Sequence, residues 1–172
     1  CRAAGLAPTA MGRVNTPGEA IDVARYFVDE GFEAATLHVG TEYYDDDEMT
    51  RVVEAIVAAS DATGFPLFIE THRATITQDA WRTIRLVERV PEVRFNADYS
   101  HWYTGTEMVY GDVEDKWRRL APVFERARFM HGRIGNPSSM QVDIGDGTTG
   151  RNVEHFREMW TRSMLGFLRA AG

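Results

Sequence analysis

Acidic and histidine side chains stand at the ends of four apolar stretches of this sequence, where they could together hold a divalent metal ion. The polar residues that close these stretches are His38, Glu70, His72, Asp98, His101, His131 and Arg133. Carboxylates and imidazoles are ligands for Mn²⁺, Mg²⁺, Co²⁺ and Zn²⁺, and a set rich in carboxylates favours the harder of these ions. Four of the five histidines belong to this group, and this concentration is the strongest functional signal in the chain.

Three of these residues are predicted to be the metal ligands. A single polar residue at the end of a strand is more often a cap or a loop contact. Glu70, Asp98 and His131, however, end three successive apolar stretches, as expected for ligands that converge on one ion. Arg133 could hold a carboxylate in place or contact an anionic substrate, and the same two roles are open for Arg73. His38 could simply face the mouth of a barrel.

Helices and strands alternate along the chain, and this order predicts how the polar ends are brought together. Helical spacing of apolar residues predicts helices at 17–30, 46–62, 77–90, 112–127 and 153–171. Short apolar runs predict strands at 34–39, 66–70, 93–98 and 128–134, with a remnant of another near 5–8. Because no hairpin signal separates them, we expect a parallel sheet with crossover helices, and its strand ends meet at one rim.

The sequence predicts an α/β protein of the parallel-strand (β/α)8 barrel type, with about four to five β-α units present. No glycine-rich phosphate loop follows any strand, which counts against a nucleotide-binding open sheet. A closed barrel needs eight strands and about 250 residues, more than the 172 residues here. We therefore expect residues 1–172 to be a single barrel domain that is truncated at both ends.

Composition and charge narrow the classes of partner. The net charge of -7 argues against a nucleic-acid backbone as the main partner, because such proteins gather Lys and Arg against phosphates. No apolar run approaches the roughly 20 residues that span a membrane, and the single cysteine, Cys1, fits a reducing compartment. These features predict a cytoplasmic protein whose partner is a small molecule or another protein. An incomplete barrel has open strand edges, so a homo-oligomer is compatible with the sequence.

Three short motifs resemble a known superfamily. With "IETHR" (69–73), "ADYSHW" (97–102) and "MHGRI" (130–134) in this order, the chain resembles the xylose isomerase-like barrels, and within them the sugar phosphate isomerases/epimerases. The resemblance runs from about residue 5 to the end. It implies a Mn²⁺-like ion bound by Glu70, Asp98 and His131. The fourth ligand, a glutamate, would lie beyond Gly172, and the resemblance does not support Asp143 or Asp146 in its place.

The implied reaction is the isomerisation or epimerisation of a sugar or sugar phosphate. The resemblance implies removal of a proton next to a carbonyl, with an enediolate stabilised by the metal. Glu70 would be both a ligand and a general acid/base, and the absent glutamate the other acid/base. His101, the histidine of the Asp-x-x-His block, and Arg133 would orient sugar hydroxyls. The remaining substrate-facing residues are His38, His72 and Trp102, whose ring would form an apolar wall for a sugar.

Other activities share parts of this pattern. A metal-dependent lyase or dehydratase on an oxidised sugar begins with the same proton abstraction. A nuclease of the endonuclease IV type, which cuts DNA at abasic sites, needs more ligands and a basic surface, and this acidic chain fits that poorly. The chain could also be a non-catalytic sugar-binding relic of a barrel.

Overall fold

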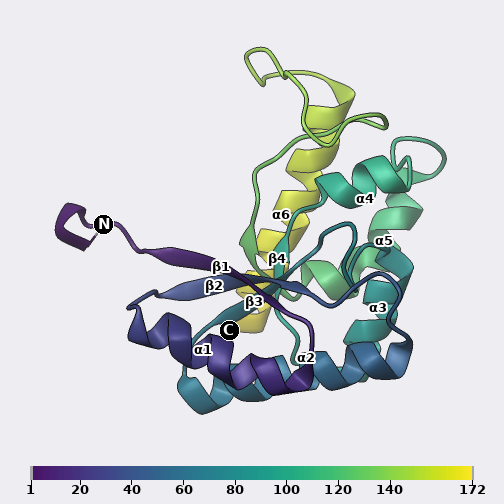
Figure 1. The fold of residues 1–172 in the computed structure, drawn as a ribbon. Coiled ribbons are helices and arrows are strands. Elements are labelled where there is room, and N and C mark those ends of the chain that lie inside the picture. Colours follow the sequence, from purple (N-terminus) through teal and green to yellow (C-terminus); the bar gives the residue numbers. More distant parts are fainter. Residues whose placement is uncertain (1, 172) are drawn as a thin grey trace.

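The computed structural model describes residues 2–171, which form one parallel sheet covered by helices (Figure 1). The strands are β1 (Thr9–Val14), β2 (Ala34–Val39), β3 (Leu67–Glu70), β4 (Phe95–Ala97) and β5 (Ala127–Met130). The α-helices are α1 (Ala20–Asp29), α2 (Asp46–Thr63), α3 (Ala80–Arg89), α4 (Ser100–Gly105), α5 (Val113–Phe124) and α6 (Arg151–Ala171). Two 3-10 helices, η1 (Arg2–Ala4) and η2 (Pro17–Glu19), complete the set of described elements.

The strand order in the sheet follows the chain, β1-β2-β3-β4-β5, and each neighbouring pair is parallel. A doubly wound sheet reverses its strand order at a switch point, whereas consecutive β-α units of a (β/α)8 barrel keep it. The prediction of an incomplete barrel-type α/β fold is therefore confirmed, with five strands instead of eight. Within residues 2–171, β1 and β5 are the edge strands, and each pairs with a single neighbouring strand.

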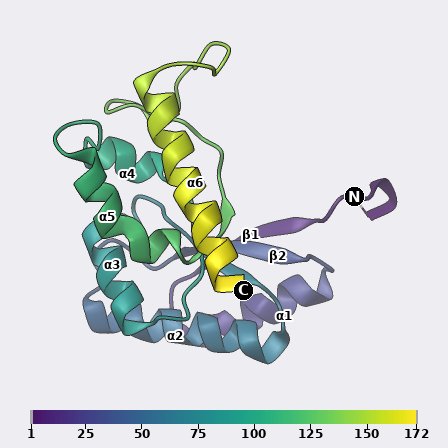
Figure 2. The ribbon, with the colours of Figure 1, turned by 180° about the vertical axis from the view of Figure 1, so that it is seen from behind.

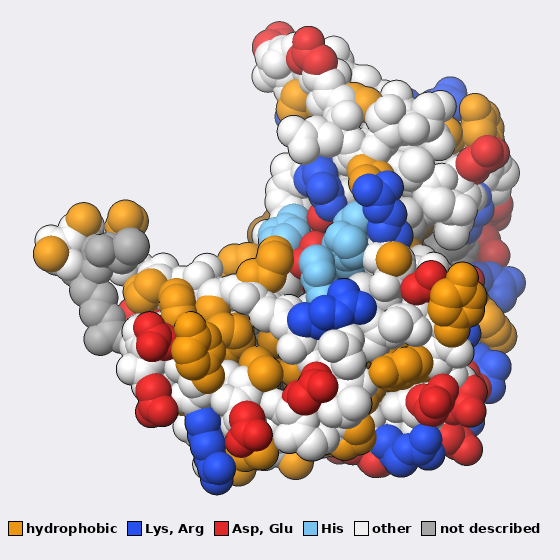
Figure 3. Space-filling model, in the orientation of Figure 1, with side chains coloured by type: hydrophobic (Ala, Val, Ile, Leu, Met, Phe, Trp, Pro, Cys, Tyr) orange, Lys and Arg blue, Asp and Glu red, His pale blue; other side chains and the backbone are white. Residues whose placement is uncertain are grey.

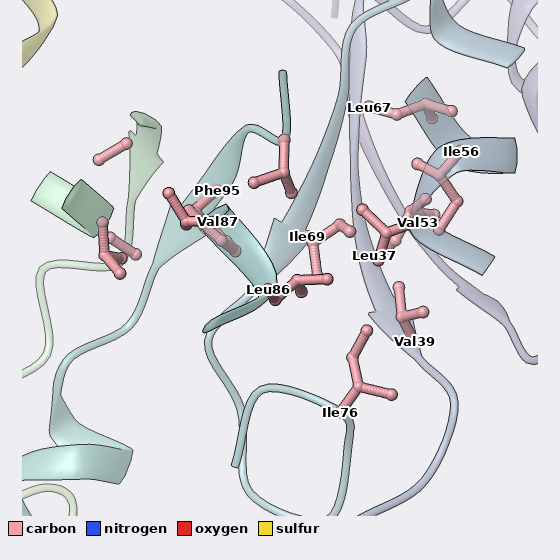
Figure 4. Packing of buried hydrophobic residues seen from close by; sticks show 14 of the residues in the cluster. Leu37, Val39, Val53, Ile56, Leu67, Ile69, Ile76, Leu86, Val87 and Phe95 are labelled. Carbon is pink, nitrogen blue, oxygen red and sulfur yellow. The ribbon is translucent and has the colours of Figure 1, made fainter. Parts of the chain in front are cut away.

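The two faces of the sheet differ in polarity, because successive side chains of a strand point to opposite faces. Leu37 and Val39 of β2, with Ile69 of β3, point towards Val53 and Ile56 of α2 in the buried apolar core (Figure 4). Thr36 and His38, the neighbours of Leu37 on β2, carry polar side chains on the opposite face. Glu70 follows Ile69 and therefore lies on that opposite face.

Local sequence explains where the helices covering the sheet begin and end. Asp45 caps α2 by accepting a hydrogen bond from the backbone N–H of Glu48, whose side chain accepts in return from the N–H of Asp45. Gly64 ends the helix at a φ of 65°, a conformation that glycine adopts without a steric penalty. Figure 2 shows α6, in yellow, packed beside α5.

Two elements were not predicted from the sequence. Strand β1 begins at Thr9, after the remnant expected at 5–8, and half of its residues are exposed. Its Gly12 permits close packing of α1, since a Cβ there would lie 2.7 Å from the ring of Phe27. Helix α4 starts directly after β4 and places Trp102 in the core. Among the described residues, no helix is both long and apolar enough to cross a membrane.

Candidate metal centre

Glu70 is the last residue of β3 and lies in the polar face of the sheet. Its carboxylate is nearly inaccessible, with 3% of the side chain exposed. The segment after the strand holds this position: Thr77 donates its hydroxyl hydrogen to the Glu70 carbonyl at 2.6 Å and accepts from the N–H of His72 at 3.1 Å. The turn includes Ala74 at a φ of 57°, a strained conformation for a residue with a Cβ.

Asp98 follows β4 and is fully buried. Its Oδ1 accepts two hydrogen bonds from Ser100, at 3.1 Å from the backbone N–H and at 2.6 Å from the hydroxyl. Its Oδ2 forms an ion pair with the guanidinium of Arg133. Burial raises the pKa of Asp98, but hydrogen bonds from His131 and Ser100 and the charge of Arg133 outweigh it and lower the pKa to about 2. Asp98 is therefore a carboxylate at neutral pH.

His131 connects the two carboxylates. Its Nδ1 lies 3.3 Å from Oε1 of Glu70 and 3.4 Å from Oδ2 of Asp98. The predicted ligands Glu70, Asp98 and His131 thus come together, with potential ligand atoms within 4.8 Å of one another. Hydrogen bonds with Asp98 and Glu70 raise the pKa of His131 to about 9. Burial raises the pKa of Glu70, but the hydrogen bond and charge of His131 outweigh it, so the pKa lies below its ordinary value.

The two carboxylates beside Nδ1 of His131 make this position favourable for positive charge. Two buried carboxylates need compensating cations, and one of them, Asp98, already pairs with Arg133. Glu70 faces imidazoles instead, so a proton on His131 supplies the remaining charge. A divalent ion contacting the same carboxylate oxygens and Nδ1 would replace that proton. The donor set therefore fits a divalent cation, and the carboxylate majority suits Mn²⁺ or Mg²⁺.

Asn96 supports the other side of the His131 ring. Its amide nitrogen lies 3.0 Å from Nε2 of His131 and donates to the Thr36 hydroxyl at 2.9 Å, while its buried Oδ1 has no partner among the described residues. The two ends of an amide are interchangeable in shape. Turning the amide would place Oδ1 against Nε2, where it could accept the N–H that His131 carries when Nδ1 binds a cation.

His38 and His72 lie on the open side of Glu70. Nε2 of His38 is 3.2 Å from Oε2 of Glu70, and its side chain is 24% exposed. The rings of His38 and His72 lie in contact, with centroids 4.2 Å apart and planes tilted by 34°. Figure 3 shows the histidines gathered in a hollow with acidic atoms between them and basic side chains around it. This position is compatible with the predicted contact of His38 and His72 with substrate.

His101 and Trp102 lie deeper than the sequence suggested. The His101 side chain is 1% exposed, and its Nε2 accepts from Arg133 at 2.8 Å. Burial lowers the pKa of His101 to about 4, so the ring is neutral and supports Arg133 from behind. The prediction that Trp102 forms a wall for substrate is wrong for this structure: its ring is fully buried, and its N–H donates to the Thr77 carbonyl at 2.8 Å.

Three further polar residues of the site were not predicted from the sequence: Asn96, Thr36 and Ser100. Asn96 and Thr36 each stand two residues before a predicted site residue, Asp98 and His38. The two-residue period of a strand places them on the same face as those residues. A polar side chain inside an otherwise apolar strand was therefore the available signal.

The chain has a weak structural match among known proteins. No protein-family model matches the chain, and no curated protein matches it. Among solved structures, the chain is similar to N-acetylneuraminate lyase from Proteus mirabilis, with 15% sequence identity and a TM-score of 0.41. The match covers 77% of this chain and 57% of the lyase chain.

Proposed function

We propose that this chain carries the metal-binding rim of a divalent-metal-dependent sugar or sugar-phosphate isomerase/epimerase. One observation carries the proposal: Glu70, Asp98 and His131 from three consecutive β-α units offer ligand atoms within 4.8 Å of one another. Active sites of (β/α)8 barrels lie at this end of the strands. Glu70, Asp98 and His131 would hold the ion, with Mn²⁺ the best candidate.

The residues around the ion position have separable roles in the proposed reaction. When bound, the divalent ion would polarise the carbonyl and the adjacent hydroxyl of a sugar as a Lewis acid. Glu70 is ionised, so its carboxylate would take the proton from the carbon next to the carbonyl. Arg133 and Ser100 hold Asp98 in place. His38 and His72, on the open side of Glu70, would contact sugar hydroxyls.

The lysine of this chain is not placed to form a Schiff base at the polar rim. Activation of a carbonyl as a Schiff base requires a lysine amine. The sequence contains one lysine, Lys116 in α5. Its ammonium donates to the carbonyl oxygens of Met108, at 3.2 Å, and Tyr110, at 2.6 Å. Lys116 is thus bound in the connection between α4 and α5 and is no part of the polar rim.

Exchange of a substrate hydrogen with solvent tests the proposal most directly. The chain with Mn²⁺ would be incubated in D₂O with a panel of aldoses, ketoses and their phosphates, and deuterium next to the carbonyl would be followed by NMR. This first step needs Glu70 alone and does not depend on a second acid/base. We expect incorporation that Glu70→Gln abolishes and that the exposed Glu54→Gln control retains. Equal exchange in wild type and Glu70→Gln would contradict the proposal.

A further inference from the structure

The two edge strands of the sheet each have one uncovered side. Among the described residues, β1 and β5 pair with a single neighbour, so each keeps backbone N–H and C=O groups that another strand can bind. Most of the exposed large apolar side chains lie beside these two strands. They are Leu6, Met11, Tyr26 and Val28 near β1, and Phe129, Met164, Leu165, Phe167 and Leu168 near β5. Open edges flanked by apolar side chains indicate a surface that binds another chain.

A groove of about 530 Å³ lies between β5 and α6. Phe129 and Met130 line it on the strand, and Met164, Phe167 and Leu168 line it on the helix. The space between an edge strand and the helix that follows it is where the next parallel strand of a β-α sheet packs. A strand in this groove would pair with β5 and cover the apolar side chains of α6.

Strand β1 carries side chains that suit this place. Gly12 packs against α1, so its neighbour Met11 lies on the other face of the sheet, where it pairs with Thr36. Phe129 pairs with Asn96 and lies on that same face. Both apolar side chains are uncovered, with Met11 60% and Phe129 37% exposed. A β1 strand placed beside β5 would therefore bring Met11 of one copy next to Phe129 of the other.

The β5 edge is basic at the end where the strand begins. Arg128 donates to the carbonyl oxygens of Glu125 and Ala127, and in the described part of the chain no carboxylate forms an ion pair with it. Burial, followed by the charges of Arg94 and Arg126, lowers the pKa of Arg128. Three guanidiniums thus lie near one another in a protein whose net charge is -7. A carboxylate from another chain would stabilise them.

The β1 edge is acidic at the same end of the sheet. Asp29 ends α1 and Glu30 caps it, at the helix terminus where the dipole makes negative charge unfavourable. Glu33 donates its backbone N–H to the carbonyl oxygen of Pro8 at 2.9 Å, directly before β1 begins. The three acidic residues are exposed, and none has an ion-pair partner within residues 2–171. Because every strand pair is parallel, β1 and β5 begin at the same end of the sheet.

We propose that β5 of one copy pairs in parallel with β1 of a second copy, so that Arg128 faces Glu33 of the partner subunit. Two copies make this contact twice about a two-fold axis, so that both edges of each copy are used. Charge disfavours the alternatives. Pairing β1 with β1 would set carboxylates against carboxylates, and pairing β5 with β5 would set guanidiniums against guanidiniums. The joined sheets surround their polar faces, so the proposed reaction would take place inside the dimer.

The mass of the purified chain in solution tests this contact. One chain has a mass of 19.4 kDa, and light scattering after size-exclusion chromatography should give twice this mass for the wild type. Arg128→Glu and Glu33→Arg each create repulsion at both contacts, so each should raise the dissociation constant of the dimer at least about 100-fold. Glu88→Arg, an exposed charge reversal on α3, is the control and should remain dimeric. Circular dichroism would verify that every variant is folded.

Mixing the two variants tests the pairing of the charges. Arg128→Glu places a carboxylate on β5 and keeps Glu33, whereas Glu33→Arg places a guanidinium beside β1 and keeps Arg128. Both contacts of a mixed dimer therefore join opposite charges, and equal amounts of the variants should form dimers that neither forms alone. A monomeric wild type, a wild-type mass that neither variant changes, or a mixture that stays monomeric would overturn the proposal. These outcomes leave the proposed function standing, because Glu70, Asp98 and His131 belong to a single copy.

Discussion

Glu70 and His131 belong to β-α units whose strands, β3 and β5, do not pair with each other, yet Oε1 of Glu70 lies 3.3 Å from Nδ1 of His131. Strand β4 lies between those strands and contributes Asp98 to the same position. The contact shows that side chains from three units converge at one rim. That convergence underlies the predictions below.

Replacing Asp98 by Asn should weaken both folding and metal binding. The substitution keeps the shape of the side chain but leaves the charge of Arg133 without its buried partner. Breaking a buried ion pair costs about 3 to 5 kcal/mol. We expect a loss of this order in the free energy of unfolding, measured by urea titration in EDTA. Adding Arg133→Met to Asp98→Asn should recover part of the lost free energy of unfolding. A double variant that is less stable than Asp98→Asn alone would contradict the pairing of Asp98 with Arg133.

Replacing Asn96 by Leu should lower metal affinity without removing a ligand. The amide supports Nε2 of His131, and loss of such a supporting contact lowers metal affinity about 10- to 100-fold. Isothermal titration with Mn²⁺ would measure this. Thr36→Val is the matched control, because it removes the hydroxyl that the amide nitrogen also contacts and leaves the amide beside His131, and we expect a smaller change. An unaltered Mn²⁺ affinity in Asn96→Leu would exclude this supporting role.

His155 should make the protein less stable in mild acid. Burial, followed by the charge of Arg151, lowers the pKa of His155 from its ordinary value of 6.5, while Glu154 opposes the shift. The ring also packs on Tyr103, whose hydroxyl lies 3.0 Å from Nδ1. The unfolded chain therefore binds the proton more tightly, and stability present above the ordinary pKa is lost as the pH falls through it.

Urea titrations of wild type and His155→Gln, at about pH 7 and about pH 5, test this linkage. His72 and His101 also have lowered pKa values and contribute to the same pH window in both proteins. The difference between the two proteins therefore reports His155. We expect the free energy of unfolding to fall less in the variant between these pH values. An equal or larger fall in the variant would show that His155 makes no such contribution.

Gly166→Ala should destabilise the protein although alanine favours helices. A Cβ at Gly166 would lie 2.8 Å from the Cα of Glu125 and 2.9 Å from the carbonyl oxygen of Phe124. These are backbone atoms at the end of α5, so α6 would have to move away. Overpacking of this kind costs about 1 to 3 kcal/mol. Gly18→Ala, where a Cβ meets nothing within 4 Å, is the control, and equal unfolding midpoints for both variants would contradict the close approach of α5 and α6.

Much of the fold followed from the sequence because apolar runs and capping residues mark the buried elements. Strand β2 has the predicted bounds, and α2 differs by one residue at its end. Helix α3 begins at Ala80 instead of 77, because Thr77 is used to hold the Glu70 turn. Strand β1 gave no such signal, since Val14 is the one buried residue among its six.

The residues at the strand ends could be predicted from the sequence, whereas the orientation of residues in the turn that follows a strand could not. Glu70, Asp98 and His131 end three successive strands, so their meeting followed from parallel topology alone. The orientation of the Trp102 side chain depends on α4, a short helix that starts at Ser100, whose backbone N–H donates to the Asp98 carboxylate. In this helix the Trp102 ring points into the core and is fully buried. A helix of six residues is too short to give a periodic apolar pattern in the sequence.

Metal content decides whether Glu70, Asp98 and His131 bind an ion. Wild type, Asp98→Asn and the exposed control Asp143→Asn would be loaded with Mn²⁺, dialysed and analysed by ICP-MS. We expect at least about one ion per chain in wild type and the control, and a loss of about one ion in Asp98→Asn. Wild-type protein that is folded and holds no divalent ion would contradict the claim that Glu70, Asp98 and His131 form a metal centre.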